Sequence, residues 1–186
     1  MRIRLAAIFC VIILLSGCRG SEDSLDRAVA LRNRILRANG CNFTAIVTAD
    51  YGEHIYVFKM DCEADRDGNL TFSVKEPATI AGITGKITGT GGAITFDDKV
   101  LAFQTIADGL VTPVTAPWLV MKTLRSGYLK DASETDQGFV ISIDDSYAEG
   151  SLQLRIRTAG DLPASGEIFW QGRRILTIVV ENFSFL

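Results

Sequence analysis

Hydrophobic and polar residues alternate along most of this chain with a period of two, which is typical of β-strands that bury one face. Residues 41–62, CNFTAIVTADYGEHIYVFKMDC, show this alternation on both sides of Tyr51-Gly52 and predict a hairpin with a two-residue loop. That register sets four pairs of residues opposite one another on the same face: Cys41 and Cys62, Phe43 and Met60, Ala45 and Phe58, and Val47 and Tyr56.

The same alternation returns in NLTFSVK, FVISI and LQLRIR, and in a last hairpin that turns at Gln171-Gly172 and sets Ile168 opposite Ile175. The final strand differs because residues 175–180, ILTIVV, are apolar on both faces. Its register gives two sets: Ile175 and Val179 with Ile168 and Trp170, and Leu176, Ile178 and Val180 with Phe169. We expect one set to face a concave interior, while the other lies under a helix, a loop or a partner, or forms an exposed patch of the kind that marks an interface.

Two segments have helical spacing instead. In residues 24–40, Ser24 is the expected N-cap, Gly40 follows the helix, and the apolar residues at helical intervals are Leu25, Ala28, Val29, Leu31, Ile35 and Leu36. Four arginines fill the other faces of this helix and contact either anionic lipid headgroups or solvent. A second helix is predicted in TPVTAPWLVMKTLRSG, with Thr115 as its cap and Pro117 in its first turn.

These elements amount to about nine or ten strands and two helices in one domain, residues 24–186. An antiparallel sheet of this size curls because its strands twist, and the curl creates an inside. The fold class expected is therefore mainly β (α+β). We predict a strongly curved antiparallel sheet that forms an incomplete β-barrel, with the N-terminal helix and the mid-chain helix in or over its concave side.

The first 18 residues have the layout of an export signal. Two arginines precede an apolar run at residues 5–15, which is shorter than the roughly 20 residues that span a bilayer. The run ends in Leu15-Ser16-Gly17-Cys18, which resembles the lipobox of bacterial lipoproteins. The resemblance implies that residues 1–17 are a signal peptide, that Cys18 is lipidated, and that residues 18–23 form a tether. The alternative is a plain export signal in which Cys18 is incidental.

Removal of the signal would leave 17 basic and 22 acidic residues, a formal charge of −5, without a basic patch for nucleic acid. With Cys10 removed and Cys18 lipidated, Cys41 and Cys62 remain. Directly opposed cysteines in an oxidising compartment favour a disulfide; the alternative is two small buried thiols.

Few residues are available for catalysis or metal binding. His54 is the only histidine and lies at the hairpin turn, and the segment 65–68 begins like a calcium loop but lacks the later ligands, which favours a turn with a glycine bulge. No nucleophile and base can be paired. We therefore expect a protein that is not an enzyme and has no metal site and no cofactor.

A lipidated N-terminus, one helix, the segment VKEPATIAGITGKI and the closing GDLPASGEIFWQGRRILTIVVENFSF together resemble the outer-membrane lipoprotein carrier (LolA/LolB-like) superfamily. In the closing segment the resemblance rests on Leu162-Pro163, Glu167, Gly172 and Asn182-Phe183. It implies a half-barrel with a hydrophobic cavity for acyl chains. The chain departs from the soluble carrier in its lipobox and in having no arginine between Cys41 and Asp50, where the carrier has one tied to its lid.

Two functions remain open from the sequence. The first is binding of an acyl chain, lipid or other apolar ligand by a monomeric, membrane-anchored protein on the extracytoplasmic side of a bacterial membrane. The candidate lining is Phe43, Tyr56, Phe58, Met60, Phe72, Trp118, Ile168 and Trp170. The same residues could instead form a dry core filled by the two helices. The second function is that of a non-enzymatic envelope or sporulation-type lipoprotein that uses this fold to dock a protein partner.

Overall fold

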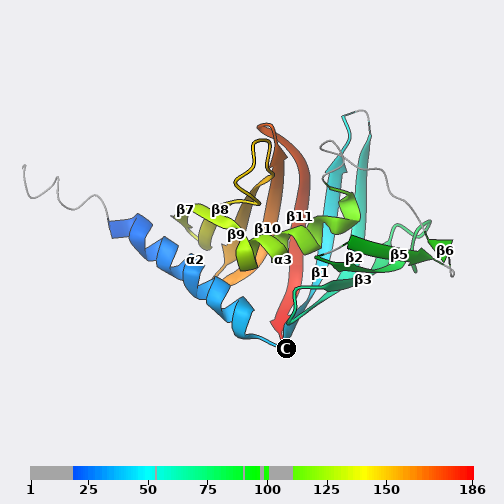
Figure 1. Cartoon of the computed structure of the whole chain (residues 1–186), viewed down its shortest axis with the longest axis horizontal. Helices are drawn as coiled ribbons and strands as arrows, with labels where there is room; N and C mark the ends of the chain where they lie inside the picture. The colour runs from blue at the N-terminus through cyan, green and yellow to red at the C-terminus, as the bar shows by residue number, and fades with distance from the viewer. Residues whose placement is uncertain (1–18, 53, 90, 97–98, 101–110) are drawn as a thin grey trace, which may run out of the picture.

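The computed structural model describes residues 19–52, 54–89, 91–96, 99–100 and 111–186. The signal segment and Cys18 lie outside the described residues, and so do residues 101–110 of the connection between the two halves of the sheet. One long, strongly curved antiparallel sheet dominates the described part, with two helices on one side of it (Figure 1).

The sheet has 11 strands among the described residues, slightly more than the sequence predicts. They are β1 (Gly40–Asp50), β2 (Ile55–Asp65), β3 (Leu70–Glu76), β4 (Thr84–Thr88), β5 (Gly91–Phe96), β6 (Lys99–Val100), β7 (Tyr128–Thr135), β8 (Gly138–Asp144), β9 (Gln153–Ala159), β10 (Leu162–Trp170) and β11 (Arg173–Phe185). Their order is β6-β5-β4-β3-β2-β1-β11-β10-β9-β8-β7, so the first and last strands pair in the middle. In the described part β6 and β7 stay unpaired with each other, which leaves the barrel open and confirms the predicted fold class.

The helices are α2 (Arg19–Arg37) and α3 (Ala116–Ser126), the latter preceded by the short 3₁₀ helix η1 (Pro113–Thr115). In Figure 1 α3 lies across the front of the sheet, and α2 runs obliquely beside β7. We call the sheet face under α3 the inner face and the opposite face the outer face. Thr115 is the N-cap of α3 and a proline occupies its first turn, as predicted.

Helix α2 begins five residues before Ser24, so residues 19–23 of the expected tether are helical. Ser24 is not the N-cap: it is buried inside the helix and its Oγ donates to the carbonyl of Ala132 on β7 at 2.9 Å. Ala28, Leu31 and Ile35 share this buried face. The other apolar residues predicted to pack with them do not, because Leu25, Val29 and Leu36 are each 41–42% exposed.

Two of the α2 arginines are bound by protein groups rather than left in solvent. Arg27 forms ion pairs with Glu134 at 3.0 Å and Asp161 at 2.8 Å, and its guanidinium lies 4.7 Å from the centre of the Phe139 ring. Arg32 reaches the end of α3. The α2 helix is therefore attached to the sheet by polar contacts as well as by its buried face.

The β1–β2 hairpin has a different register from the predicted one. Asp50 pairs with Ile55, so the loop has four residues rather than two, and Cys41 faces Ala64 while Cys62 faces Phe43. Because the shift is by two residues, the predicted face is still the buried one. The predicted Cys41–Cys62 disulfide is wrong, since both thiols are free and buried.

A bulge also changes the last hairpin. The turn lies at Gln171-Gly172 as predicted, with φ of 50° and 77°, but Ile168 pairs with Leu176 instead of Ile175. The pairing of β10 with β11 is offset by one residue as a result. Leu176 and Ile178 are buried on the inner face, whereas Val179 is 46% exposed on the outer face. Val179 thus lies on the opposite face from Leu176 and Ile178, as predicted, but the prediction that Val179 shares the face of Ile168 is wrong, because Ile168 pairs with Leu176.

Among the described residues there is no helix both long enough and apolar enough to cross a membrane.

Candidate functional site

Most of the predicted lining residues meet on the inner face. They are nearly inaccessible there, with exposed fractions of 0–8%. These residues are Phe43 on β1, Phe58 and Met60 on β2, Phe72 on β3 and Ile168 on β10. Trp118 on α3 and Trp170 at the end of β10 are partly buried against the same core, while Tyr56, near the hairpin tip, is 47% exposed.

Helix α3 fills the concave side of the sheet. Its residues Leu119, Val120, Met121 and Leu124 are buried in one continuous core with the inner face. A hollow of about 10 Å³ lies between Cys41, Met121 and Phe185. That is about the space that one water molecule occupies, so this hollow could not hold an alkyl chain.

Polar contacts hold α3 at both ends. Near its start, Trp118 Nε1 donates to the carbonyl of Gly68 at 3.1 Å. At its end, Arg125 Nη2 donates to the carbonyl of Arg66 at 2.8 Å. Arg32 of α2 donates to the carbonyls of Leu124 at 2.8 Å and Gly127 at 2.7 Å. The helix is thus tied to the β2–β3 turn on one side and to α2 on the other.

Arg32 occupies an unusual environment. Burial lowers the pKa of its guanidinium, and the partners that the structure gives it are the carbonyls of Thr123, Leu124 and Gly127. The last carbonyls of a helix lack partners within the helix and carry its negative partial charge, so a cation stabilises them. Arg32 therefore acts as a cap on α3 that is supplied by another helix.

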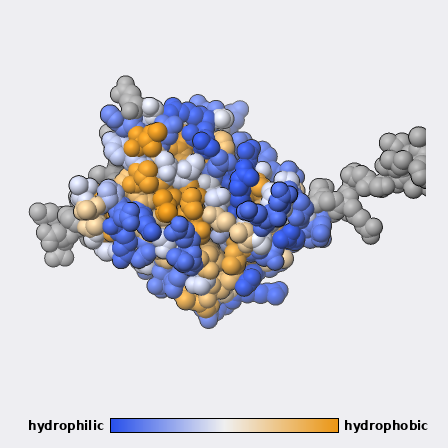
Figure 2. Space-filling view, turned by 180° about the vertical axis from the view of Figure 1, so that it is seen from behind, coloured by the Kyte–Doolittle hydropathy of each residue, from blue (hydrophilic) through white to orange (hydrophobic). Residues whose placement is uncertain are grey.

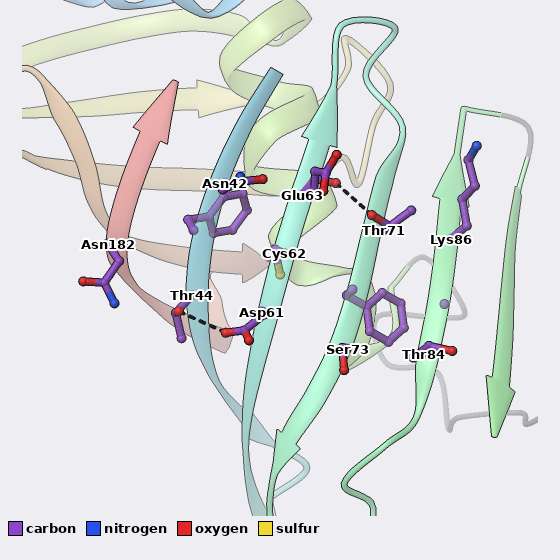
Figure 3. Close-up of a pocket in the computed structure, with 13 residues that line it drawn as sticks. Asn42, Thr44, Asp61, Cys62, Glu63, Thr71, Ser73, Thr84, Lys86 and Asn182 are labelled. Atoms are coloured by element: carbon purple, nitrogen blue, oxygen red, sulfur yellow. Dashed lines mark hydrogen bonds between the residues drawn. The ribbon is translucent and has the colours of Figure 1, made fainter. Parts of the chain in front are cut away.

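A polar groove of about 740 Å³ crosses the outer face of β1–β4 (Figure 3). Two rows of side chains line it. Each row runs across the four strands and takes one residue from each, in the register of the sheet. The first row is Asn42, Glu63, Thr71 and Lys86, and the second is Thr44, Asp61, Ser73 and Thr84. Thr44 Oγ1 donates to Asp61 Oδ1 at 3.2 Å. Phe43, Cys62 and Phe72 also contribute to its lining.

An apolar strip lies on the outer face beside this groove. We define it as Ile46, Ile55, Val57 and Val179, of which Ile55, Val57 and Val179 are 68%, 52% and 46% exposed. Ile46 pairs with Val179 across β1 and β11, which places the strip at the centre of the sheet. Figure 2 shows hydrophobic side chains gathered on this side of the molecule. An exposed patch on one face of the last strand is one of the alternatives that the sequence predicts, but the contribution of Ile55 and Val57 was not predicted, although the consecutive apolar residues 55–57 were a signal for it.

The free cysteines are part of the inner core. Burial raises the pKa of Cys41 to about 11 and also raises the pKa of Cys62. A thiol that stays protonated is a poor nucleophile. In the described part of the chain no three His, Cys, Asp or Glu side chains gather where they could hold a metal ion.

The segment 65–68 forms the β2–β3 turn, with Gly68 at φ 86°. Asp65 Oδ1 accepts hydrogen bonds from the backbone N–H groups of Asp67 and Asn69, each at 2.9 Å, and Asp65 Oδ2 accepts one from Asn69 Nδ2 at 2.8 Å. The carboxylate therefore stabilises the turn itself, in agreement with the glycine turn favoured by the sequence.

Comparison with known proteins finds neither a matching family model nor a significantly similar curated protein. Solved structures are similar to this chain. An uncharacterised conserved protein from Thermus thermophilus is 12% identical, with 89% of this chain and 86% of that chain covered and a TM-score of 0.48. A LolA superfamily protein from Nitrosomonas europaea is 8% identical, with 90% and 94% covered and a TM-score of 0.45.

A putative outer membrane lipoprotein-sorting protein domain from Vibrio parahaemolyticus is 11% identical, with 88% and 92% covered and a TM-score of 0.45. The solved structures similar to this chain thus include LolA-like proteins, as the sequence resemblance predicts. With TM-scores below 0.5, these similarities carry no argument about what the chain binds.

Proposed function

We propose that this chain is a non-enzymatic, lipid-anchored protein on the extracytoplasmic side of a bacterial membrane that holds an acyl chain or another apolar ligand on the inner face of its half-barrel. The observation that carries the proposal is the arrangement of the inner face. An open sheet presents a continuous apolar surface, and a single short helix, α3, covers its centre.

Binding requires α3 to move, because the buried side chains of α3 occupy the space where the ligand would lie. The apolar wall beneath it consists of Phe43, Met60, Phe72 and Ile168. Burial of alkyl groups against such a wall is worth about 0.8 kcal/mol per methylene. A long acyl chain could therefore replace the contacts that α3 loses, while the polar ties at the helix ends oppose the opening.

The anchor is proposed from the sequence. Cys18 follows Leu15-Ser16-Gly17, and two or more acyl chains on this residue would hold the protein stably on a membrane surface. The mass of the mature protein tests this directly: cleavage before Cys18 and an added diacylglycerol are both visible in an intact-mass measurement.

Arg32 provides a sharp test of ligand binding. If α3 must open, the apparent affinity for a ligand scales with the populated fraction of the open state. Arg32→Met removes the hydrogen bonds to Leu124 and Gly127 and should strengthen binding of a fluorescent fatty acid several-fold. Arg37→Met is the matched control, since Arg37 is exposed on the same helix and should change nothing. If the unmodified protein and both variants fail to bind the fatty acid, and no lipid co-purifies in native mass spectrometry, the proposal is wrong.

A second function, docking of a protein partner, is favoured by one observation, the exposed apolar strip on the outer face. A photo-crosslinking residue at Val57 should capture such a partner in cells, whereas the same residue at Thr71, exposed in the polar groove, should not. Equal capture at both positions, or capture at neither, would argue against docking through this strip.

A further inference from the structure

One face of α2 is apolar and uncovered in the described structure. Leu25, Val29 and Leu36 are exposed by 41%, 41% and 42%. At 100° per residue these three positions fall within about 40° of one another around the helix axis. They form a single stripe about 16 Å long, since each helical residue rises about 1.5 Å. The stripe is separate from the face of α2 that is buried against the sheet.

Glu22 lies about 60° from Leu25 and borders this stripe, while the other charges of α2 are turned away from it or tied to the protein. Asp26 and Arg37 point to another side of the helix, about 100° from Leu25 and Leu36. Arg32 is the charged residue within the stripe, and its guanidinium reaches back to the carbonyls at the end of α3. The stripe therefore presents apolar groups, while the neighbouring exposed side is polar, which is the pattern of a helix that lies in a membrane interface.

The position of α2 in the chain indicates what covers the stripe. The helix starts at Arg19, the residue directly after Cys18, so no flexible linker separates the helix from the proposed lipid anchor. Leu25 is seven residues from Cys18, or about 10 Å along a helix. Acyl chains on Cys18 would thus hold the first turns of α2 against the bilayer whatever else the domain does.

We propose that α2 lies along the membrane surface with Leu25, Val29 and Leu36 immersed among the phospholipids. This inference rests on the lipid anchor of the proposed function. Its consequence is a fixed orientation of the half-barrel. Because Arg32 joins the stripe to the end of α3, α3 and the opening of the half-barrel lie close to the bilayer rather than far out in solvent.

Three pairs of neighbouring positions test the immersion. The full-length lipidated protein is reconstituted in vesicles of phosphatidylethanolamine and phosphatidylglycerol, with one cysteine carrying an environment-sensitive fluorophore. The stripe positions are Leu25, Val29 and Leu36, and their controls are Asp26, Ala30 and Arg37. All six residues are exposed, and each control is only one residue farther from the anchor than its partner. Cys41 and Cys62 are buried and stay unlabelled in the folded protein.

Lipids with a nitroxide on the acyl chain should quench the fluorophore at least threefold more strongly at each stripe position than at its neighbour. Equal quenching within all three pairs, in a protein that floats with the vesicles, would overturn the inference and leave the anchor intact. A protein that fails to float and has an unmodified Cys18 would instead refute the anchor itself, and the immersion of α2 with it. Unchanged thermal unfolding of the six variants is the control for folding.

Discussion

Gly166 on β10 lies under α3, and its replacement by alanine tests how closely that helix packs on the inner face. A Cβ atom at this position would be 2.9 Å from Ile178 Cγ2 and 3.2 Å from Val120 Cγ2. Both distances are shorter than ordinary van der Waals contact, so β11 or α3 must shift. Overpacking of this kind typically costs about 1–3 kcal/mol.

Val120 provides the second half of a double-mutant cycle. Val120→Ala removes two buried methyl groups, which should cost about 2 kcal/mol, but it also removes the α3 atom that crowds position 166. The double variant should therefore be more stable than the sum of the two single changes by at least about 0.5 kcal/mol. Urea unfolding of the chain from Arg19 onward, followed by tryptophan fluorescence, measures all four free energies.

Close packing of α3 on β10 requires two results. Gly166→Ala must lower the free energy of unfolding by more than the ~0.5 kcal/mol typical of neutral changes, and the cycle must show a favourable coupling with Val120. A neutral Gly166→Ala variant, or strictly additive costs, would mean that α3 does not pack on β10 at the distance described.

Three further outcomes are expected. Burial against the inner core and the raised pKa of both thiols should keep Cys41 and Cys62 unreactive towards a thiol reagent at pH 8 in the folded protein. Both of these thiols should react after unfolding, and fast labelling of either one in the native protein would contradict the prediction. Although desolvation acts to raise the pKa of Asp65, the hydrogen bonds from Asn69 and its neighbours hold it below its ordinary value. Asp65→Ala should therefore lower the free energy of unfolding by about 1–2 kcal/mol at pH 7. In urea unfolding at a series of pH values, this loss should shrink as the pH falls below about 4, because the carboxylate becomes protonated. A loss that stays constant with pH would refute the charged role of Asp65. Ser24→Ala should lower the free energy of unfolding by about 1–3 kcal/mol because it leaves a buried carbonyl of β7 without its donor, which a chemical denaturation curve would detect.

The alternation of side chains predicts which residues of β1 and β2 are buried but not their exact partners. A two-residue turn and a four-residue turn at 51–54 place the same residues on the inner face, because they differ by an even shift. Only the turn geometry distinguishes them, and Tyr51-Gly52 is compatible with both. The disulfide depended on that choice, since the four-residue turn moves Cys62 from Cys41 to a position opposite Phe43.

For the last strand and for α2, the pattern of side chains does not identify the residues that they contact. A bulge beside Ile168 changes the partners of β11, and nothing in the residues 173–180 marks it, so the predicted pairing of Ile168 with Ile175 is wrong. In α2, helical spacing identifies the apolar positions but cannot tell which of two apolar stripes meets the sheet. The contact of Ser24 with β7 decides it, and that contact joins residues more than a hundred positions apart.

The strand order also affects when the protein can fold. β1 to β6 form one series of neighbours and β7 to β11 another, and the pairing of β1 with β11 unites them. This pairing joins residues that are far apart in the sequence, such as Cys41 and Phe185. A chain that emerges N-terminus first, from a ribosome or an export channel, cannot complete its central strand pair until β11 is free. We therefore expect each half to form its local hairpins early, and the sheet to be completed only after β11 has been released.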